Sequence, residues 1–228
     1  MRRRGSPQQS LTCVFLSYRR ADALLIDSIY DKLRLAGLRV FKDVEGFMAG
    51  RPFDAELVRI MMRGLPVFAP VFTLASLQRL GAAATKCDAF LAEMLVALCL
   101  REAGSGCLVH PLLVGAATKV GWTASLLEDP AYDAALAALP DVTSAATVAL
   151  VSAALCSAGA APMPPHIAAL TVREVVLGRA AAPAVAGVLD APFVLACTSS
   201  STADLGLYIS RQYAQPMWDA VRKRRPAA

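Results

Sequence analysis

The first half of the chain alternates between two kinds of hydrophobic pattern. Short runs rich in β-formers, such as Cys13–Tyr18 and Leu65–Phe72, are typical of buried strands. Between these runs, apolar residues recur at the spacing of one helix face, as in Ala21–Ala36, where Leu25 and Ile29 lie one turn apart. A pattern that switches repeatedly between these two periods predicts strands alternating with helices.

Taken in chain order, the pattern predicts a short series of elements. The expected strands are Cys13–Tyr18, Leu38–Phe41, Leu65–Phe72 and Cys107–Val114. The expected helices are Ala21–Ala36, a helix from Asp54 to Gly64, and Cys87–Glu102. Such alternation implies a parallel sheet covered by helices on both faces. With right-handed crossovers, the expected fold is a flavodoxin-like, doubly wound α/β sheet.

Prolines make the third expected strand unusual. Pro66 and Pro70 both fall within Leu65–Phe72. Proline cannot donate a hydrogen bond to a neighbouring strand, so this strand is either irregular or near an edge of the sheet.

The second half of the chain has a weaker pattern and is expected to be rich in helix. The expected elements are helices at Thr143–Ala158, Thr171–Gly178 and Tyr208–Val221 and a strand at Ala191–Cys197. Thr171 and Glu174 have the spacing of a capping box. We divide the chain into a disordered basic N-terminus at 1–10, one domain at 11–158 and a C-terminal extension at 159–228.

Charge and cysteine usage exclude several classes of function. The net charge of +5 comes partly from the terminal runs Arg2–Arg4 and Arg222–Arg225, and no basic face interleaved with aromatics indicates nucleic-acid binding. The 6 cysteines include no C-x-x-C pair and accompany only 2 histidines, which argues against a zinc site and for a reducing, cytoplasmic compartment.

Membrane and secretory signals are not evident in the sequence. The longest stretch without charge, Val142–Ile167, is built mainly from alanine, serine and threonine, so we expect a helix and a linker and no membrane span. The arginines at the N-terminus are followed by polar residues, where a secretory signal would need an apolar run.

Polar groups follow the first two expected strands directly. Ser17, Arg19 and Arg20 stand at the end of the first strand, and the loop Asp43–Phe53 follows the second. Ligands of open parallel sheets bind at the carboxyl ends of strands. We therefore expect these two loops and Glu93, on the helix Cys87–Glu102, to form one site.

Three motifs on these elements resemble those of a known family. They read FLSYRRAD at Phe15–Asp22, GLRVFKDVEGFMAGRPF at Gly37–Phe53 and KCDAFLAEMLVAL at Lys86–Leu98. Their order and spacing are similar to those of a TIR (Toll/interleukin-1 receptor) domain, and LVHPLLVG at Leu108–Gly115 resembles a later strand of the same fold. The resemblance covers roughly Leu11 to Gly115, and extends more loosely to about Gly178.

The resemblance implies an activity and a catalytic residue. NAD-cleaving TIR domains break the bond between nicotinamide and ribose, and Glu93 occupies the position of their catalytic glutamate. NAD⁺ would be the substrate, with no cofactor or metal, and the products would be nicotinamide and ADP-ribose or its cyclic form. The loop Asp43–Phe53 would mediate self-association with other TIR domains, as in signalling or defence.

The other site residues have alternative roles. Arg19 and Arg20 could bind the pyrophosphate, or one of them could pair with Asp22 or Asp43 to hold the corner. Phe53 and Phe90 could stack on a ring of the substrate or belong to the core. The hydroxyl of Ser17 could cap the next helix or touch the ligand, and Asp43 is better suited to anchoring its loop than to chemistry.

Two departures and one alternative function accompany this hypothesis. Many family members have a tryptophan near the third motif, where this chain has Cys87 and Phe90, and Pro52 looks like an extra residue before Phe53. The alternative is a non-catalytic TIR adaptor that only assembles with other TIR domains. Glu93 would then be dispensable.

Overall fold

The structure is a computed structural model that describes residues 14–35, 37–42, 55–62, 67–105, 107–114, 117–118, 121–122 and 130–177. The strands are β1 (Val14–Ser17), β2 (Val40–Lys42), β3 (Val67–Phe72), β4 (Leu108–Val109), β5 (Leu112–Leu113), β6 (Ala117–Thr118) and β7 (Gly121–Trp122). The expected basic N-terminus, the loop Asp43–Phe53 and the elements expected after Gly178 lie outside the described residues.

The helices follow the alternation that the sequence predicts. They are η1 (Arg20–Asp22), α1 (Ala23–Leu35), α3 (Ala55–Met62), α4 (Leu74–Leu80), α5 (Ala89–Glu102), α6 (Pro130–Ala137), α7 (Ala145–Ala158), α8 (Pro165–Ala168) and α9 (Val172–Leu177). Within the described ranges, no helix has the length and hydrophobicity needed to cross a bilayer.

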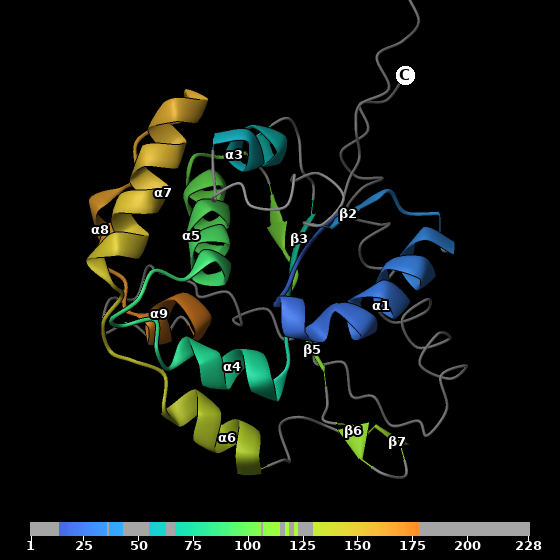
Figure 1. The fold of residues 1–228 in the computed structure, drawn as a ribbon. Helices are drawn as coiled ribbons and strands as arrows, with labels where there is room; N and C mark the ends of the chain where they lie inside the picture. Colours follow the sequence, from blue (N-terminus) through green and yellow to red (C-terminus); the bar gives the residue numbers. More distant parts are fainter. Residues whose placement is uncertain are drawn as a thin grey trace, which may run out of the picture.

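The main sheet is parallel, with strand order β2-β1-β3-β4, and β5 pairs with β3 beyond β4 (Figure 1). The chain passes from β1 to β2 on one side and returns through α3 to β3 on the other side of β1. This arrangement confirms the expected flavodoxin-like α/β fold with helices on both faces of the sheet.

The fourth expected strand is interrupted, which corrects the prediction of one strand over Cys107–Val114. β4 pairs with Val67 and Phe68, and β5 pairs with Val71 and Phe72, so the break lies opposite Pro70. Pro111 lies within the break, and neither proline can donate a backbone hydrogen bond. β3 is irregular in its pairing and lies between β1 and β4, not at an edge.

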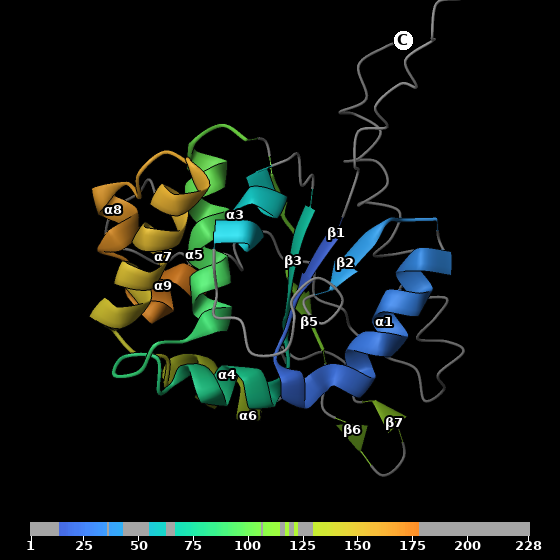
Figure 2. The same cartoon turned by 45° about the horizontal axis from the view of Figure 1, so that its top comes forward.

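The two faces of β1 contact different helices because successive side chains of a strand point to opposite sides. Val14 and Leu16 join the core beneath α1, whereas Phe15 belongs to the core that contains α5. Figure 2 shows α1 on one side of the sheet and α3 and α5 on the other, with α7, α8 and α9 beyond α5. Ser17, which follows Phe15 by two residues, is thereby directed toward α5.

Helix α5 is the central helix of the molecule. Every residue from Phe90 to Leu100 is buried, because the sheet covers one side of the helix and the layer of α7, α8 and α9 covers the other. Residues after Ala158 belong to the same core, including Ile167 in α8 and Val172 and Val176 in α9. The hydrophobic cluster around α5 therefore draws on residues from both sides of Ala158.

The helix ends explain small shifts from the expected boundaries. Asp88 caps α5, so this helix begins at Ala89 and not at Cys87. Glu174 and Thr171 form the expected capping box, in which the Glu174 backbone N–H donates to Thr171 Oγ1 at 3.1 Å and the Thr171 backbone N–H donates to Glu174 Oε2 at 2.7 Å. Gly159, with a φ of +73°, ends α7 in a left-handed conformation that favours glycine.

Candidate functional site

The first feature of the candidate site is a hydrogen bond between the sheet and α5. Ser17 is the last residue of β1 and is fully buried, and its hydroxyl donates to Oε2 of Glu93 on α5. Glu93 is a buried residue, with only 7% of its surface exposed. Its carboxylate therefore lies at the carboxyl end of the central strand, in a setting where charge interacts more strongly than in water.

Arg19 makes the second contact between the β1 corner and α5. Its Nη2 lies 2.6 Å from Oδ2 of Asp88, and its guanidinium lies 5.3 Å from the centre of the Phe90 ring. Its Nε is buried and makes no hydrogen bond within the described residues, so the ion pair and the ring hold the guanidinium. The sequence predicted Asp22 or Asp43 as the structural partner of an arginine here. Arg19 pairs with Asp88, whereas the Asp22 carboxylate accepts from Thr73, and Asp43 lies outside the described residues.

Asp22 connects the corner to helix α4. Its two carboxylate oxygens accept from the Thr73 hydroxyl at 3.2 and 3.1 Å. Thr73 is the N-cap of α4, and its hydroxyl accepts from the Ser76 backbone N–H at 3.0 Å. Burial raises the pKa of Asp22, while the Thr73 hydrogen bond and the charges of Arg79 and Arg19 act in the opposite direction.

Helix α7 fastens the segment that precedes α5. The Asp88 backbone N–H donates to Thr147 Oγ1 at 3.2 Å, and the Ser144 hydroxyl donates to the Lys86 carbonyl at 3.1 Å. The Ser144 backbone N–H also donates to the Ala83 carbonyl at 3.1 Å. These contacts were not predicted from the sequence, where the only available signal was a serine and a threonine at the start of an alanine-rich helix.

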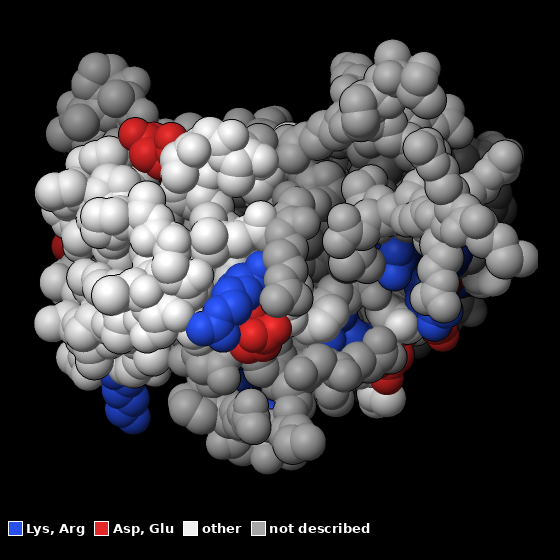
Figure 3. Space-filling view, turned by 90° about the horizontal axis from the view of Figure 1, so that it is seen from above, with Lys and Arg blue, Asp and Glu red and all other residues white. Residues whose placement is uncertain are grey.

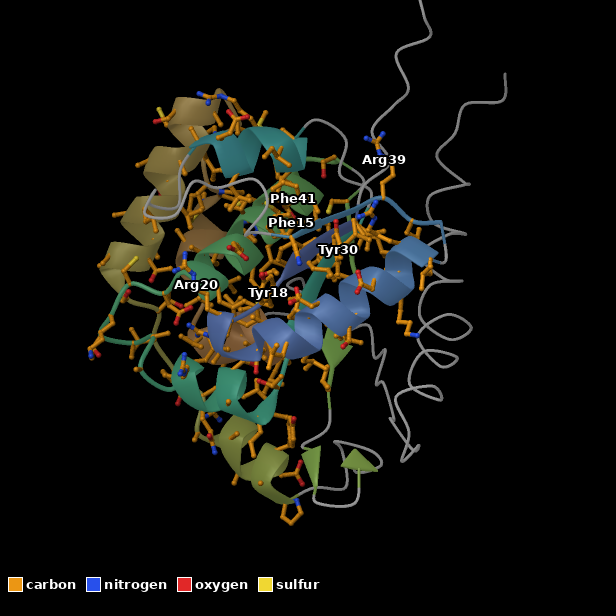
Figure 4. The ribbon with its side chains drawn as sticks, turned by 45° about the vertical axis from the view of Figure 1, so that its right-hand side comes forward. Phe15, Tyr18, Arg20, Tyr30, Arg39 and Phe41 are labelled. Carbon is orange, nitrogen blue, oxygen red and sulfur yellow. The ribbon has the colours of Figure 1, made fainter. Side chains whose placement is uncertain are left out.

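The structure places the remaining predicted site residues in three ways. Phe90 is buried, and its ring packs edge-on to Phe72 with centroids 5.4 Å apart, beneath the Arg19 guanidinium. Arg20 is exposed on η1, and Figure 4 shows it on the opposite side of the molecule from Arg39. Asp43 and Phe53 lie outside the described residues. Ser17, Arg19, Phe90 and Glu93 are thus the predicted residues that the fold brings together.

A separate cluster holds the edge strand β2 to α1. Lys42 Nζ lies 2.7 Å from Asp27 Oδ1 and 4.5 Å from the centre of the Tyr30 ring. Arg34 lies over the same ring, with its guanidinium carbon 5.4 Å from the centroid. Figure 4 shows Tyr30 on α1, facing the sheet. These contacts connect β2 to α1.

Burial shifts the pKa of two further ionisable groups, His110 and Cys99. His110, at the break between β4 and β5, is fully buried, and burial lowers its pKa to about 4. Burial also raises the pKa of the Cys99 thiol on α5 to about 12, so it is not a thiolate nucleophile at neutral pH. Neither group contributes a reactive side chain to the corner.

The surface gives little support to anion binding on the side of the helical layer. Seen from above in Figure 3, the described surface there is largely uncharged, and α7 contains no charged residue. Among the described residues, no group of three or more His, Cys, Asp or Glu side chains is placed to hold a metal. Near the carboxyl end of β1, the described charged residues include Arg19, Arg20 and Asp22 in the corner, together with Asp88 and Glu93 of the α5 segment.

No family model matches the sequence, and no curated protein matches it either. Any assignment of function therefore depends on the residues of the β1 corner and their arrangement.

Proposed function

We propose that this chain is a TIR-domain NAD⁺ nucleosidase, which cleaves the bond between nicotinamide and ribose. The observation that carries the proposal is the buried hydrogen bond from Ser17 to Glu93. It lies at the carboxyl end of β1, beside the point where the strand order reverses between β1 and β3. Ligands of this class of sheet bind at that point.

The chemistry needs one well-placed carboxylate. Nicotinamide leaves as a neutral molecule, so a general acid is not required. The ribose carbon passes through a state that resembles an oxocarbenium ion, as in glycoside hydrolysis. Glu93 is suited to stabilise this positive charge, because a fixed carboxylate screened from water interacts with it strongly. Water or the adenine base then captures the ribosyl cation, which gives ADP-ribose or a cyclic product.

The other parts of the proposal concern binding and assembly. Arg20 is exposed beside the corner and offers a guanidinium to the pyrophosphate of NAD⁺. Self-association with other TIR domains, through the loop Asp43–Phe53, activates the enzyme in a cytoplasmic signalling or defence role.

A second candidate function has its own supporting observation. Ser17, Arg19 and Asp22 all make internal contacts with α4 or α5, or with the residues that cap them. A corner whose polar residues serve only to fix helices suits a non-catalytic TIR adaptor that acts by assembly. In that case Glu93 has no catalytic role, and a substitution of Glu93 that keeps the fold leaves the function intact.

The two functions are separated by measuring nicotinamide release from NAD⁺ with purified protein at high concentration. The parent should release nicotinamide, and Glu93→Gln should lose at least about 100-fold of the rate, because one preorganised group contributes on this scale. Glu102→Gln is the matched control, since Glu102 lies exposed on the same helix and should leave the rate unchanged.

Each variant is checked for folding by its thermal transition. A folded parent that self-associates without releasing nicotinamide would favour the adaptor. Equal release by the parent and a folded Glu93→Gln protein would refute the catalytic role of Glu93.

A further inference from the structure

The β1 corner is attached to α5 at two points. Ser17 and Arg19 are two residues apart on extended backbone, and both reach α5, at Glu93 and at its cap Asp88. Two residues of extended chain span roughly 7 Å, and five residues of helix rise roughly 7.5 Å. The two attachments therefore match in spacing and together fix where α5 lies along the sheet.

We propose that Arg19 is a positioning residue for Glu93 and not a ligand of the substrate phosphates. The ion pair between Arg19 and Asp88 holds the first turn of α5 in place. The Glu93 carboxylate then lies where the Ser17 hydroxyl can donate a hydrogen bond to it and where it can act on the substrate. This inference rests on the proposed function for its consequence in catalysis. Of the two arginines, it leaves only Arg20 to bind the pyrophosphate of NAD⁺.

The contacts of Asp88 explain why Arg19 is not available to a substrate. Oδ1 of Asp88 accepts from the Leu91 backbone N–H at 2.9 Å, Oδ2 accepts from Arg19 at 2.6 Å, and its own N–H donates to Thr147. The side chains of Arg19 and Asp88 are only 16% and 10% exposed. A phosphate that captured Arg19 would leave the Asp88 carboxylate without its counter-ion in a largely buried position, which is costly.

The geometry also joins three layers of the molecule at one residue. Through Asp88, the corner that follows β1 (Arg19), the central helix α5 and the outer helix α7 (Thr147) are linked by direct hydrogen bonds. Displacements of about 1 Å in a catalytic group can reduce a rate by two orders of magnitude. A substitution that breaks the contacts of Asp88 should therefore lower the rate at saturating NAD⁺ and have little effect on substrate binding.

The kinetic test uses Arg19→Gln, Asp88→Asn, the double variant and Arg19→Lys. We expect Arg19→Gln and Asp88→Asn each to lower kcat by about 10-fold or more, with KM within about 2-fold of the parent value. The kcat of the double variant should be no lower than that of the less active of these two variants. Arg19→Lys, which keeps the charge, should recover part of kcat. The inference would be overturned if KM rose in Arg19→Gln but not in Asp88→Asn, and if the effects of the two substitutions added in the double variant. That result would leave the NAD⁺ nucleosidase proposal intact.

A second readout tests the positioning even if the parent releases no nicotinamide. The ¹³C resonance of the Glu93 side-chain carboxyl reports its surroundings, and it should shift in both Arg19→Gln and Asp88→Asn. The matched control is the Lys42–Asp27 pair, whose N–O distance is 2.7 Å and which lies between β2 and α1. Lys42→Gln should leave the Glu93 resonance in place. An unmoved Glu93 resonance in folded Arg19 and Asp88 variants would overturn the inference whatever the activity of the parent.

Discussion

Acid should destabilise this protein through His110. The imidazole is fully buried, and burial lowers its pKa from the ordinary 6.5 to about 4. The folded state therefore binds fewer protons than the unfolded state between pH 6.5 and 4, so the free energy of unfolding falls as the pH falls through this window. At 1.36 kcal/mol per pKa unit, the full effect is about 3 kcal/mol, which is a large part of the stability of an ordinary domain.

The assay is urea unfolding of the parent and two variants at pH 7 and pH 4.5. The parent should lose about 2 to 3 kcal/mol between these conditions through His110. His110→Gln has no imidazole to titrate. Between pH 7 and pH 4.5, its free energy of unfolding should therefore fall by about 2 to 3 kcal/mol less than that of the parent, whatever its stability at pH 7. The control is His166→Gln, because His166 is the other histidine of the chain and its side chain is 48% exposed.

Asp22 acts in the opposite direction and does not account for the expected loss. Its pKa is raised in the folded state, so the folded protein takes up its proton more readily than the unfolded chain as the pH falls, which favours folding in acid. An equal loss of stability in the parent and in His110→Gln would refute the reasoning. A His110 ring that titrates near pH 6.5 in the folded protein, followed by its NMR shifts, would refute it independently.

Two further predictions concern single contacts. The Tyr132 hydroxyl donates to the Val114 carbonyl in a buried setting that fastens α6 to the end of β5, so Tyr132→Phe should lower the free energy of unfolding by about 1 to 3 kcal/mol in urea titrations. Gly159→Ala should cost only about 1 to 2 kcal/mol in the same titrations, because a Cβ there meets nothing within 4 Å and the penalty is that of the φ of +73° alone.

The sequence predicted the parts of the fold that depend on local periodicity. The short apolar run at β1 and the helical spacing in α1 and α5 were sufficient to predict the parallel sheet and its helices. The break at His110 and Pro111 was not predicted, although Pro70 gave a signal. It depends on which residues lie opposite each other in neighbouring strands, and local sequence does not determine that register.

The candidate site was predicted as a set of residues but not as a set of contacts. Glu93 and Ser17 are 76 residues apart in the chain, and Arg19 and Asp88 are 69 apart. The sequence predicted Asp22 or Asp43 as a structural partner for Arg19 or Arg20, as an alternative to binding the pyrophosphate. Asp88 was available as a partner because the helix cap places its carboxylate beside the β1 corner, and only the packing of α5 on the sheet brings the two together.

Folding alone accounts for most of the polar corner, and this decides where its function should be sought. Asp22 supports the cap of α4, and Arg19 supports the cap of α5, so both would be retained in a protein with no catalytic role. Glu93 is different, because a buried carboxyl group costs free energy that an apolar residue at the same position would not. The Ser17 hydroxyl reduces that cost, and the same hydrogen bond helps to fix α5 along the sheet. A buried carboxyl group with this desolvation cost is a candidate functional group, in line with the role proposed for Glu93. Glu93→Gln therefore tests the proposed catalytic role separately from the fold, since it retains the shape of the side chain and removes the charge.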